Sequence, residues 1–159
     1  MAMTMQVDGI EELSRMLTDL GDKAEEVAAR ALYDGAGVMA DAYTRAVDSI
    51  MVSEMHPPEN VKRLALVEEK AALLGKTGIA KFDKNGSEVE TSVGLSGKLG
   101  YVQIMGHKVA VRKLAYAINS GTSFMVKQPV FRRAATQAKE AASAAIVEKA
   151  EKLFDEITK

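Results

Sequence analysis

The stretch that decides the fold class is residues 85–95, NGSEVETSVGL. Asn-Gly is the strongest short-range signal for a hairpin turn, and here it separates residues 79–84 from residues 87–95. In the second arm, polar residues alternate with a series of apolar or β-branched ones: Val89, Thr91, Val93 and Leu95. This alternation is the pattern of a half-buried strand. We therefore predict an antiparallel hairpin in the middle of the chain.

The sequence before the hairpin has a helical period. Residues 7–20 predict a short amphipathic helix, and residues 22–46 predict a longer one with an alanine-rich face. Gly35 and Gly37 lie inside the longer helix, where glycine costs about 1 kcal/mol relative to alanine. The apolar spacing keeps its phase across both glycines, so we interpret them as a point where another backbone approaches closely.

A third helix is predicted over residues 59–74, after an irregular segment at residues 51–58 that contains two prolines. Gly75 would end this helix. Its predicted inner face consists of the residues Val61, Leu64, Ala65, Ala72 and Leu73.

After the hairpin, residues 101–105 and 109–118 are strand candidates, and residues 121–129 form a loop. A long helix is then predicted from Pro129, a residue that is favoured in the first turn of a helix. Its apolar stripe is Phe131, Ala135, Ala138, Ala142, Ile146, Ala150, Leu153 and Ile157. Such small residues allow tight packing against a neighbour, in the same chain or in another copy.

The order of these elements predicts a single α+β domain over residues 1–159. In it, an antiparallel meander sheet is packed by two N-terminal helices, a middle helix and a long C-terminal helix. No internal repeat or domain boundary is visible.

Composition excludes several classes of protein. The chain has 159 residues, with 21 Lys and Arg against 22 Asp and Glu, and this balance argues against a dedicated nucleic-acid binder. It has no cysteine, which excludes disulfides, iron–sulfur clusters and thiol nucleophiles. The longest apolar run, residues 114–118, is too short for a membrane helix or a secretory signal. We therefore expect a soluble protein made inside the cell.

No motif of catalysis or cofactor binding is complete. Gly75-Lys76-Thr77 resembles the end of a phosphate-binding loop, but Lys70 stands where that motif needs a further glycine. The two histidines, His56 and His107, form no metal-binding helical pair. We therefore expect no cofactor, no metal and no enzymatic activity, and a protein that works by shape and association.

One segment is more specific. Residues 116–123, YAINSGTS, together with residues 128–134, QPVFRRA, resemble a paired motif of the head–tail joining, neck or tail-completion proteins of tailed phages and prophages. The order of the predicted elements is similar to that of this family over nearly the whole chain.

The residues of this segment also have a physical interpretation of their own. Gly121 permits a turn, and the Thr122 hydroxyl can bond to the loop backbone. Pro129 would set the start of the last helix, and Phe131 would anchor that start in the core. Two interpretations remain open. These residues only shape the corner between a strand and a helix, or the corner also faces a neighbouring subunit. The predicted interface set is Tyr116, Gly121, Thr122, Pro129, Phe131, Arg132 and Arg133.

The resemblance implies a non-enzymatic structural protein of the virion, made in the host bacterial cytoplasm. Its partners would be further copies of itself in an oligomeric ring, and the phage connector and tail proteins. DNA would pass through such a ring without sequence-specific binding, and a free copy would be monomeric until it meets its partner. The alanine-rich stripe and the hairpin at Asn85-Gly86 are the predicted contact patches between copies, since a closed ring needs two different patches.

Two alternatives remain open from the sequence. One is a small intracellular enzyme whose site is assembled around His107. The other is a regulatory module that binds another protein.

Overall fold

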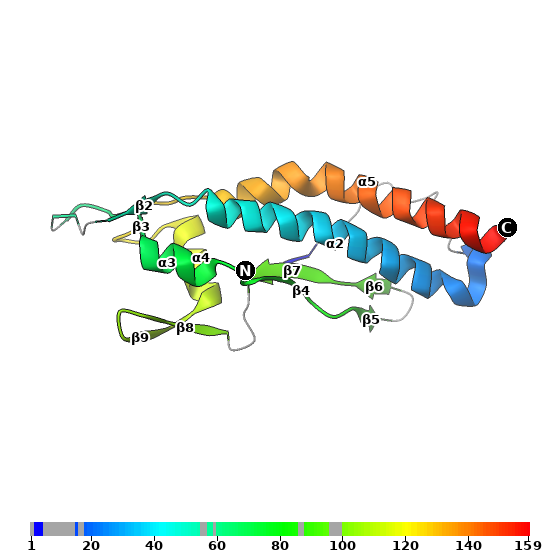
Figure 1. Ribbon diagram of the computed structural model, residues 1–159, viewed down its shortest axis with the longest axis horizontal. Coiled ribbons are helices and arrows are strands. Elements are labelled where there is room, and N and C mark those ends of the chain that lie inside the picture. The colour runs from blue at the N-terminus through cyan, green and yellow to red at the C-terminus, as the bar shows by residue number, and fades with distance from the viewer. Residues whose placement is uncertain are drawn as a thin grey trace.

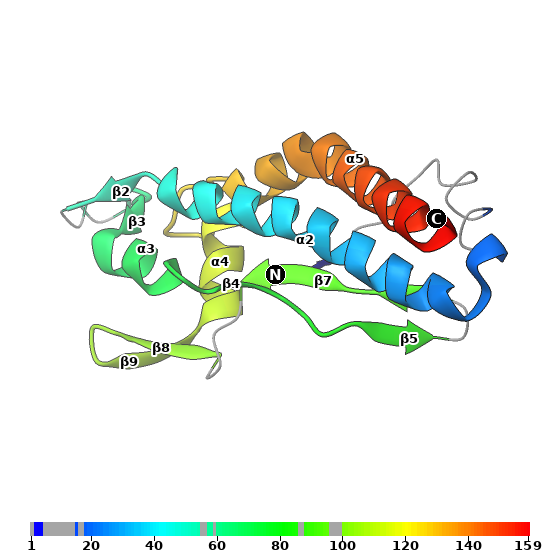
Figure 2. The same ribbon diagram turned by 45° about the vertical axis from the view of Figure 1, so that its right-hand side comes forward.

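The fold is α+β, and its longest elements are two helices that lie side by side along the molecule (Figure 1). The computed structural model describes residues 2–4, 15, 18–54, 57–58, 60–85, 88–95 and 100–159. Helix α2 (Ala24–Asp48) follows the short 3-10 turn η1 (Gly21–Lys23), and it runs antiparallel to α5 (Val130–Thr158). Strands lie on the side of α2 away from α5, as Figures 1 and 2 show.

The α2–α5 contact confirms the prediction of a long C-terminal helix with an apolar stripe. The buried residues of α5 are Phe131, Ala135, Ala138, Ala142, Ile146, Ala150 and Leu153, which is the predicted stripe except Ile157. Ile157 is 37% exposed. Because this stripe packs on α2 of the same chain, it is not available to a second copy, and its predicted role as a contact patch was wrong.

The two glycines of α2 differ. Gly35 is buried and faces α5, so the predicted close approach is confirmed there. Gly37 has open space where a side chain would be, and the same interpretation was wrong for it.

The central sheet has three strands in the order β1 (Ala2–Thr4), β7 (Ser92–Leu95) and β4 (Thr77–Ile79), all antiparallel. Beyond them, β5 (Asp83–Asn85) pairs with β6 (Glu88–Glu90), and Asn85 lies opposite Glu88. The predicted hairpin is thus confirmed, although each arm divides into two short strands. Val93 and Leu95 are buried under α2, as the alternation predicted.

The predicted helix over residues 59–74 is shorter than expected, because only α3 (Val67–Leu73) is helical. Before it, β2 (Val52–Ser53) pairs in parallel with β3 (Ala65–Leu66). Arg63 pairs in parallel with Met125 in the loop before α5, which holds this segment extended. Val61 is consequently exposed, and it was wrongly placed on an inner face.

The predicted strand over residues 109–118 was wrong. The strands β8 (Tyr101–Ile104) and β9 (His107–Ala110) form a hairpin, and α4 (Val111–Ser120) follows directly. Four apolar residues of α4 are buried: Val111, Leu114, Ala115 and Ile118. Their spacing of three, one and three residues is helical, and it explains why Arg112-Lys113 broke the strand pattern. The predicted helix over residues 7–20 falls almost entirely outside the described residues.

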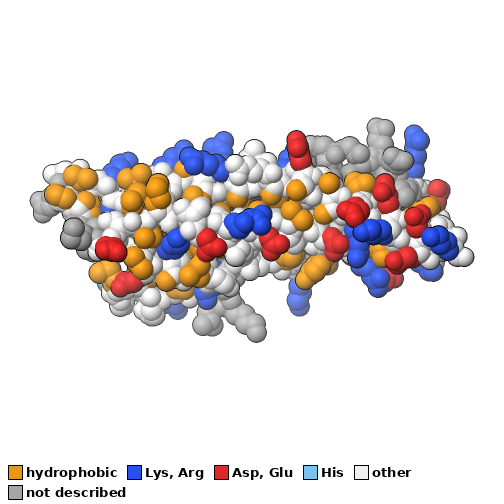
Figure 3. Space-filling model, turned by 45° about the horizontal axis from the view of Figure 1, so that its top comes forward, with side chains coloured by type: hydrophobic (Ala, Val, Ile, Leu, Met, Phe, Trp, Pro, Cys, Tyr) orange, Lys and Arg blue, Asp and Glu red, His pale blue; other side chains and the backbone are white. Residues whose placement is uncertain are grey.

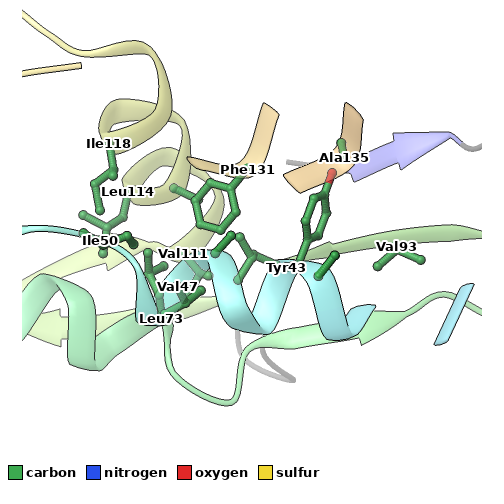
Figure 4. Close-up of a cluster of buried hydrophobic side chains, with 14 of the residues drawn as sticks. Tyr43, Val47, Ile50, Leu73, Val93, Val111, Leu114, Ile118, Phe131 and Ala135 are labelled. Atoms are coloured by element: carbon green, nitrogen blue, oxygen red, sulfur yellow. The ribbon is translucent and has the colours of Figure 1, made fainter. Parts of the chain in front are cut away.

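The main core lies where α2, α4 and α5 converge (Figure 4). Tyr43 and Phe131 meet edge to face, with ring centroids 5.8 Å apart, and both are fully buried. A smaller cluster continues the core toward the far end of the helix pair, formed by Val27, Ala31, Ile146, Ala150 and Leu153.

Candidate functional site

The candidate site is the corner at which α4 ends and α5 begins. Helix α4 stops at Gly121, whose φ of 75° favours glycine and whose N–H donates to the Ala117 carbonyl at 2.8 Å. A Cβ at this position would lie 3.0–3.1 Å from the backbone and Cβ of Lys127. Gly121 is therefore required both for the turn and for the close return of the loop.

Thr122 fixes the loop. Its Oγ1 accepts hydrogen bonds from the N–H groups of Met125, at 3.0 Å, and Phe124, at 3.3 Å. The Thr122 N–H donates to the Met125 carbonyl at 3.0 Å. The hydroxyl is thus tied to the loop backbone, as the sequence predicted.

Gln128 connects the loop to the end of α2. It is 4% exposed, its Oε1 accepts from the Met51 N–H at 2.8 Å, and its Nε2 donates to the Met51 carbonyl at 2.9 Å. Its own N–H donates to the Ile118 carbonyl at 2.8 Å. Gln128 therefore joins the loop to the segment after α2 through its side chain and to α4 through its backbone.

The start of α5 is fixed by its neighbours. Pro129 occupies the N-cap position, directly before the first turn in which it was predicted to lie. Its carbonyl accepts a hydrogen bond from the Arg133 N–H. The buried Asn119 side chain on α4 accepts from the Arg132 N–H at 3.2 Å. Phe131 anchors the helix in the core against Tyr43, so its ring does not face a partner.

A buried ion pair supports the other side of the loop. Arg63 makes a two-pronged contact with Glu69, with N–O distances of 2.7 and 2.8 Å, and the side chains are 14% and 9% exposed. The hydrogen bonds that the Arg63 guanidinium donates to the Glu69 carboxylate raise the pKa of Arg63 above its ordinary value, so the guanidinium stays charged. Glu69 also accepts from the Leu66 N–H at 2.8 Å, at the start of α3.

Arg63 reaches the loop as well. Its guanidinium carbon lies 5.8 Å from the centre of the Phe124 ring, and its backbone bonds to Phe124 and Val126. Sequence reasoning missed the roles of Arg63, Glu69 and Gln128. Gln128 stands at the start of the quoted QPVFRRA segment, but its side chain bonds to Met51, 77 residues away. Nothing in the spacing of Arg63 and Glu69 indicates an ion pair.

The predicted site residues divide into scaffold and surface. Gly121, Thr122, Pro129 and Phe131 shape the corner from inside or from its partly buried rim. Tyr116, Arg132 and Arg133 are exposed around it.

Exposed apolar side chains gather at this end of the molecule. Five of them, each between 51% and 63% exposed, form what we call the apolar end patch: Met51, Val61, Val67, Met105 and Phe124. Val67 and Met105 line one shallow hollow, and Phe124 lies beside Arg63, two residues from Val61. Figure 3 shows hydrophobic side chains gathered at this end.

The described part of the chain holds no cluster of three metal-ligating side chains. His107 is exposed at the start of β9, opposite Ile104. His56 lies outside the described residues. A hollow of about 390 Å³ lies between α2 and α5, with a floor of small residues and with Arg45 and Arg133 on its walls. Within the ranges that the structure describes, no helix is long and apolar enough to cross a membrane.

Comparison of this chain with protein-family models, with curated protein sequences and with solved structures found no match.

Proposed function

We propose that this chain is a structural, non-enzymatic protein of a tailed phage or prophage, and that it joins head to tail or completes the tail end as a subunit of a ring. The observation that carries the proposal is the corner from Tyr116 to Arg133, whose sequence resembles that of the neck proteins. The geometry of this corner supports a role in association.

The corner is a braced scaffold. Three polar side chains of the corner form hydrogen bonds with backbone groups of the same chain: those of Thr122, Gln128 and Asn119. Side chains that are used in this way hold a surface in shape and are not free for chemistry. A fixed surface costs less conformational entropy when a partner binds.

The apolar end patch is the surface that we assign to protein contact. Protein interfaces have an apolar centre with a polar rim, and exposed apolar side chains gathered in one region mark such sites. A closed ring needs a second, different patch. The β5–β6 hairpin remains our candidate for it, since it lies at the other end of the strand layer (Figure 1).

Mass measurement in solution tests this proposal. The chain is measured alone and after mixing with connector and tail-tube proteins of a long-tailed phage. We expect a defined higher-mass complex in the mixture, and its loss in the double variant Phe124→Ser, Met105→Ser.

The matched control is Ile157→Ser, which removes an exposed apolar side chain at the opposite end of α5. It should assemble as the unmodified chain does. The proposal fails if no mixture gives a complex, or if the control loses the complex and the patch variant keeps it. An activity screen in which His107→Ala abolishes turnover would favour an enzyme instead.

A further inference from the structure

The charges of this chain are unevenly distributed along the sequence. Residues 91–139 contain eight Lys and Arg and no Asp or Glu. The rest of the chain therefore carries all 22 acidic residues and only 13 basic ones. The near-neutral total conceals this separation.

Five of these basic residues lie on α4, in the loop that follows it and in the first turn of α5, and we call them the basic cluster: Arg112, Lys113, Lys127, Arg132 and Arg133. All five are exposed. Arg112 and Lys113 lie on the outer face of α4, Lys127 returns beside Gly121, and the N–H of Arg132 bonds to Asn119 near the end of α4.

None of the five has an ion-pair partner within the described part of the chain. Elsewhere basic residues are paired, as in Arg30 with Glu26 and Lys84 with Glu25. Exposed cations without an ion-pair partner create a local positive potential. The Debye length is about 10 Å at 0.1 M salt, so acidic groups farther away than that weaken this potential little.

The cluster is not built for a small anion. The backbone N–H groups of Val130, Arg132 and Arg133 at the start of α5 already donate to acceptors of the chain itself. The five side chains stand in solvent and do not converge in an enclosed cavity. Such a surface fits a large anion that meets several cations at once.

We propose that the basic cluster binds the phosphate backbone of double-stranded DNA without sequence preference. Backbone binding needs only exposed cations, since phosphates carry most of the affinity and none of the sequence information. An acidic protein is the less favoured partner, because protein interfaces have an apolar centre and all five residues of this cluster are charged. This inference goes beyond the proposed joining function and does not depend on ring assembly.

The cluster is also long enough to meet several phosphates. From Arg112 to Ser120, α4 rises about 12 Å, while a duplex carries one charge per about 1.7 Å of its axis. Net charge argued only against a dedicated nucleic-acid binder, whereas the position of the charges supports contact with the DNA backbone without sequence preference.

Fluorescence anisotropy with the full chain tests the inference. Two labelled 30-base-pair duplexes of unrelated sequence are titrated at 50 and 200 mM NaCl. We expect both to bind with Kd values within about threefold of each other. We expect about a hundredfold weakening at the higher salt, as for about four phosphate contacts.

The variant Arg112→Glu, Lys113→Glu, Arg132→Glu should weaken binding at least tenfold. The control Lys23→Glu, Lys81→Glu, Lys159→Glu has the same net charge, changes three exposed residues away from the cluster, and should lose much less. A milder variant with glutamine at positions 112, 113 and 132 should fall between the two, and circular dichroism checks that each variant is folded.

The proposal is overturned if the chain does not bind DNA at 50 mM NaCl, or if the control loses as much affinity as the cluster variant. It is also overturned if one duplex is strongly preferred, or if the chain binds polyglutamate and not DNA. Since the readout uses DNA and the free chain, its failure is distinct from a failure to form a complex with phage proteins.

Discussion

Ile146 of α5 lies directly over Gly35 of α2, and it occupies the space in which any other residue would place its side chain. A Cβ on Gly35 would overlap Ile146 Cγ1, and it would lie 2.7 Å from Ile146 Cδ1 and 3.0 Å from the carbonyl oxygen of Ala142. Both Gly35 and Ile146 are buried. The closest point of the helix pair is therefore set by the absence of a side chain.

The first prediction concerns this contact. Gly35→Ala should lower the free energy of unfolding by about 1–3 kcal/mol, although alanine is the better helix former, because the core there is already full. Urea denaturation followed by circular dichroism measures the change. Adding Ile146→Val should recover part of the loss.

Gly37→Ala is the matched control for this prediction. It is the same substitution two residues along α2, at a position with open space. It should raise the free energy of unfolding by up to about 1 kcal/mol. Equal effects at the two positions would contradict the assignment of Gly35 as a packing glycine.

The second prediction concerns the buried ion pair. Arg63→Ala should lower the free energy of unfolding by about 3–5 kcal/mol, because it leaves the Glu69 carboxylate buried without its partner. The exposed pair of Arg30 with Glu26 is the control, and Arg30→Ala should cost less than about 1 kcal/mol. The double variant Arg63→Ala, Glu69→Ala lacks the carboxylate as well. If its free energy of unfolding falls as far as that of Arg63→Ala alone, the unpaired carboxylate is not the cause of the loss.

The third prediction concerns Gln128. Gln128→Ala should cost about 1–3 kcal/mol, because the N–H and carbonyl of Met51 lose their partner together. Hydrogen exchange at the Met51 amide should become faster. The control is Gln103→Ala, at an exposed position, and it should change neither the stability nor this exchange rate. An unchanged exchange rate of the Met51 amide in Gln128→Ala would contradict the role of Gln128.

The fourth prediction concerns high pH. Burial raises the pKa of the Tyr43 hydroxyl above its ordinary value of about 10. Above that pH the unfolded chain releases this proton while the folded chain keeps it, so stability falls as the pH rises. Below pH 10 both states hold the proton, and this dependence disappears.

Denaturation at pH 8.0 and pH 10.5 measures the effect. The loss of stability between the two should be smaller in Tyr43→Phe than in the unmodified chain. The exposed Tyr101→Phe should behave like the unmodified chain. An equal loss in all three proteins would mean that Tyr43 does not contribute.

The elements that the sequence predicted well are those whose signal is local. The apolar stripe of α5 repeats every three or four residues over seven buried positions. The two residues Asn85-Gly86 are by themselves enough to predict the hairpin. Such periods are set by the geometry of a single helix or strand. The α+β class followed from them.

The errors have two physical causes, which are pairing with distant parts of the chain and an apolar run too short to show its period. The segment before α3 has helical spacing, but the backbone of Arg63 bonds to Phe124 and Val126, and these bonds hold it extended. In α4, a short apolar run left the strand and helix periods indistinguishable until Leu114 and Ile118 were seen buried together.

For the candidate site, the glycine, the threonine and the helix start were predictable, because their roles depend on the residues next to them. Gln128 and the Arg63–Glu69 pair were not, because nothing in their spacing indicates a partner. The basic cluster did leave a signal, the absence of acidic residues over residues 91–139, but only when charge is counted by segment.

The continuous packing of α2 on α5 has a mechanical consequence. Buried residues extend from Phe131 beside the corner to Val27 and Leu153 near the opposite tip, so we expect the pair to move as a rigid body. With a length of about 43 Å, a tilt of about 10° at the corner displaces the tip by about 7 Å. A partner that binds at the corner and changes the angle of the helix pair slightly would thus cause a larger displacement at its opposite tip.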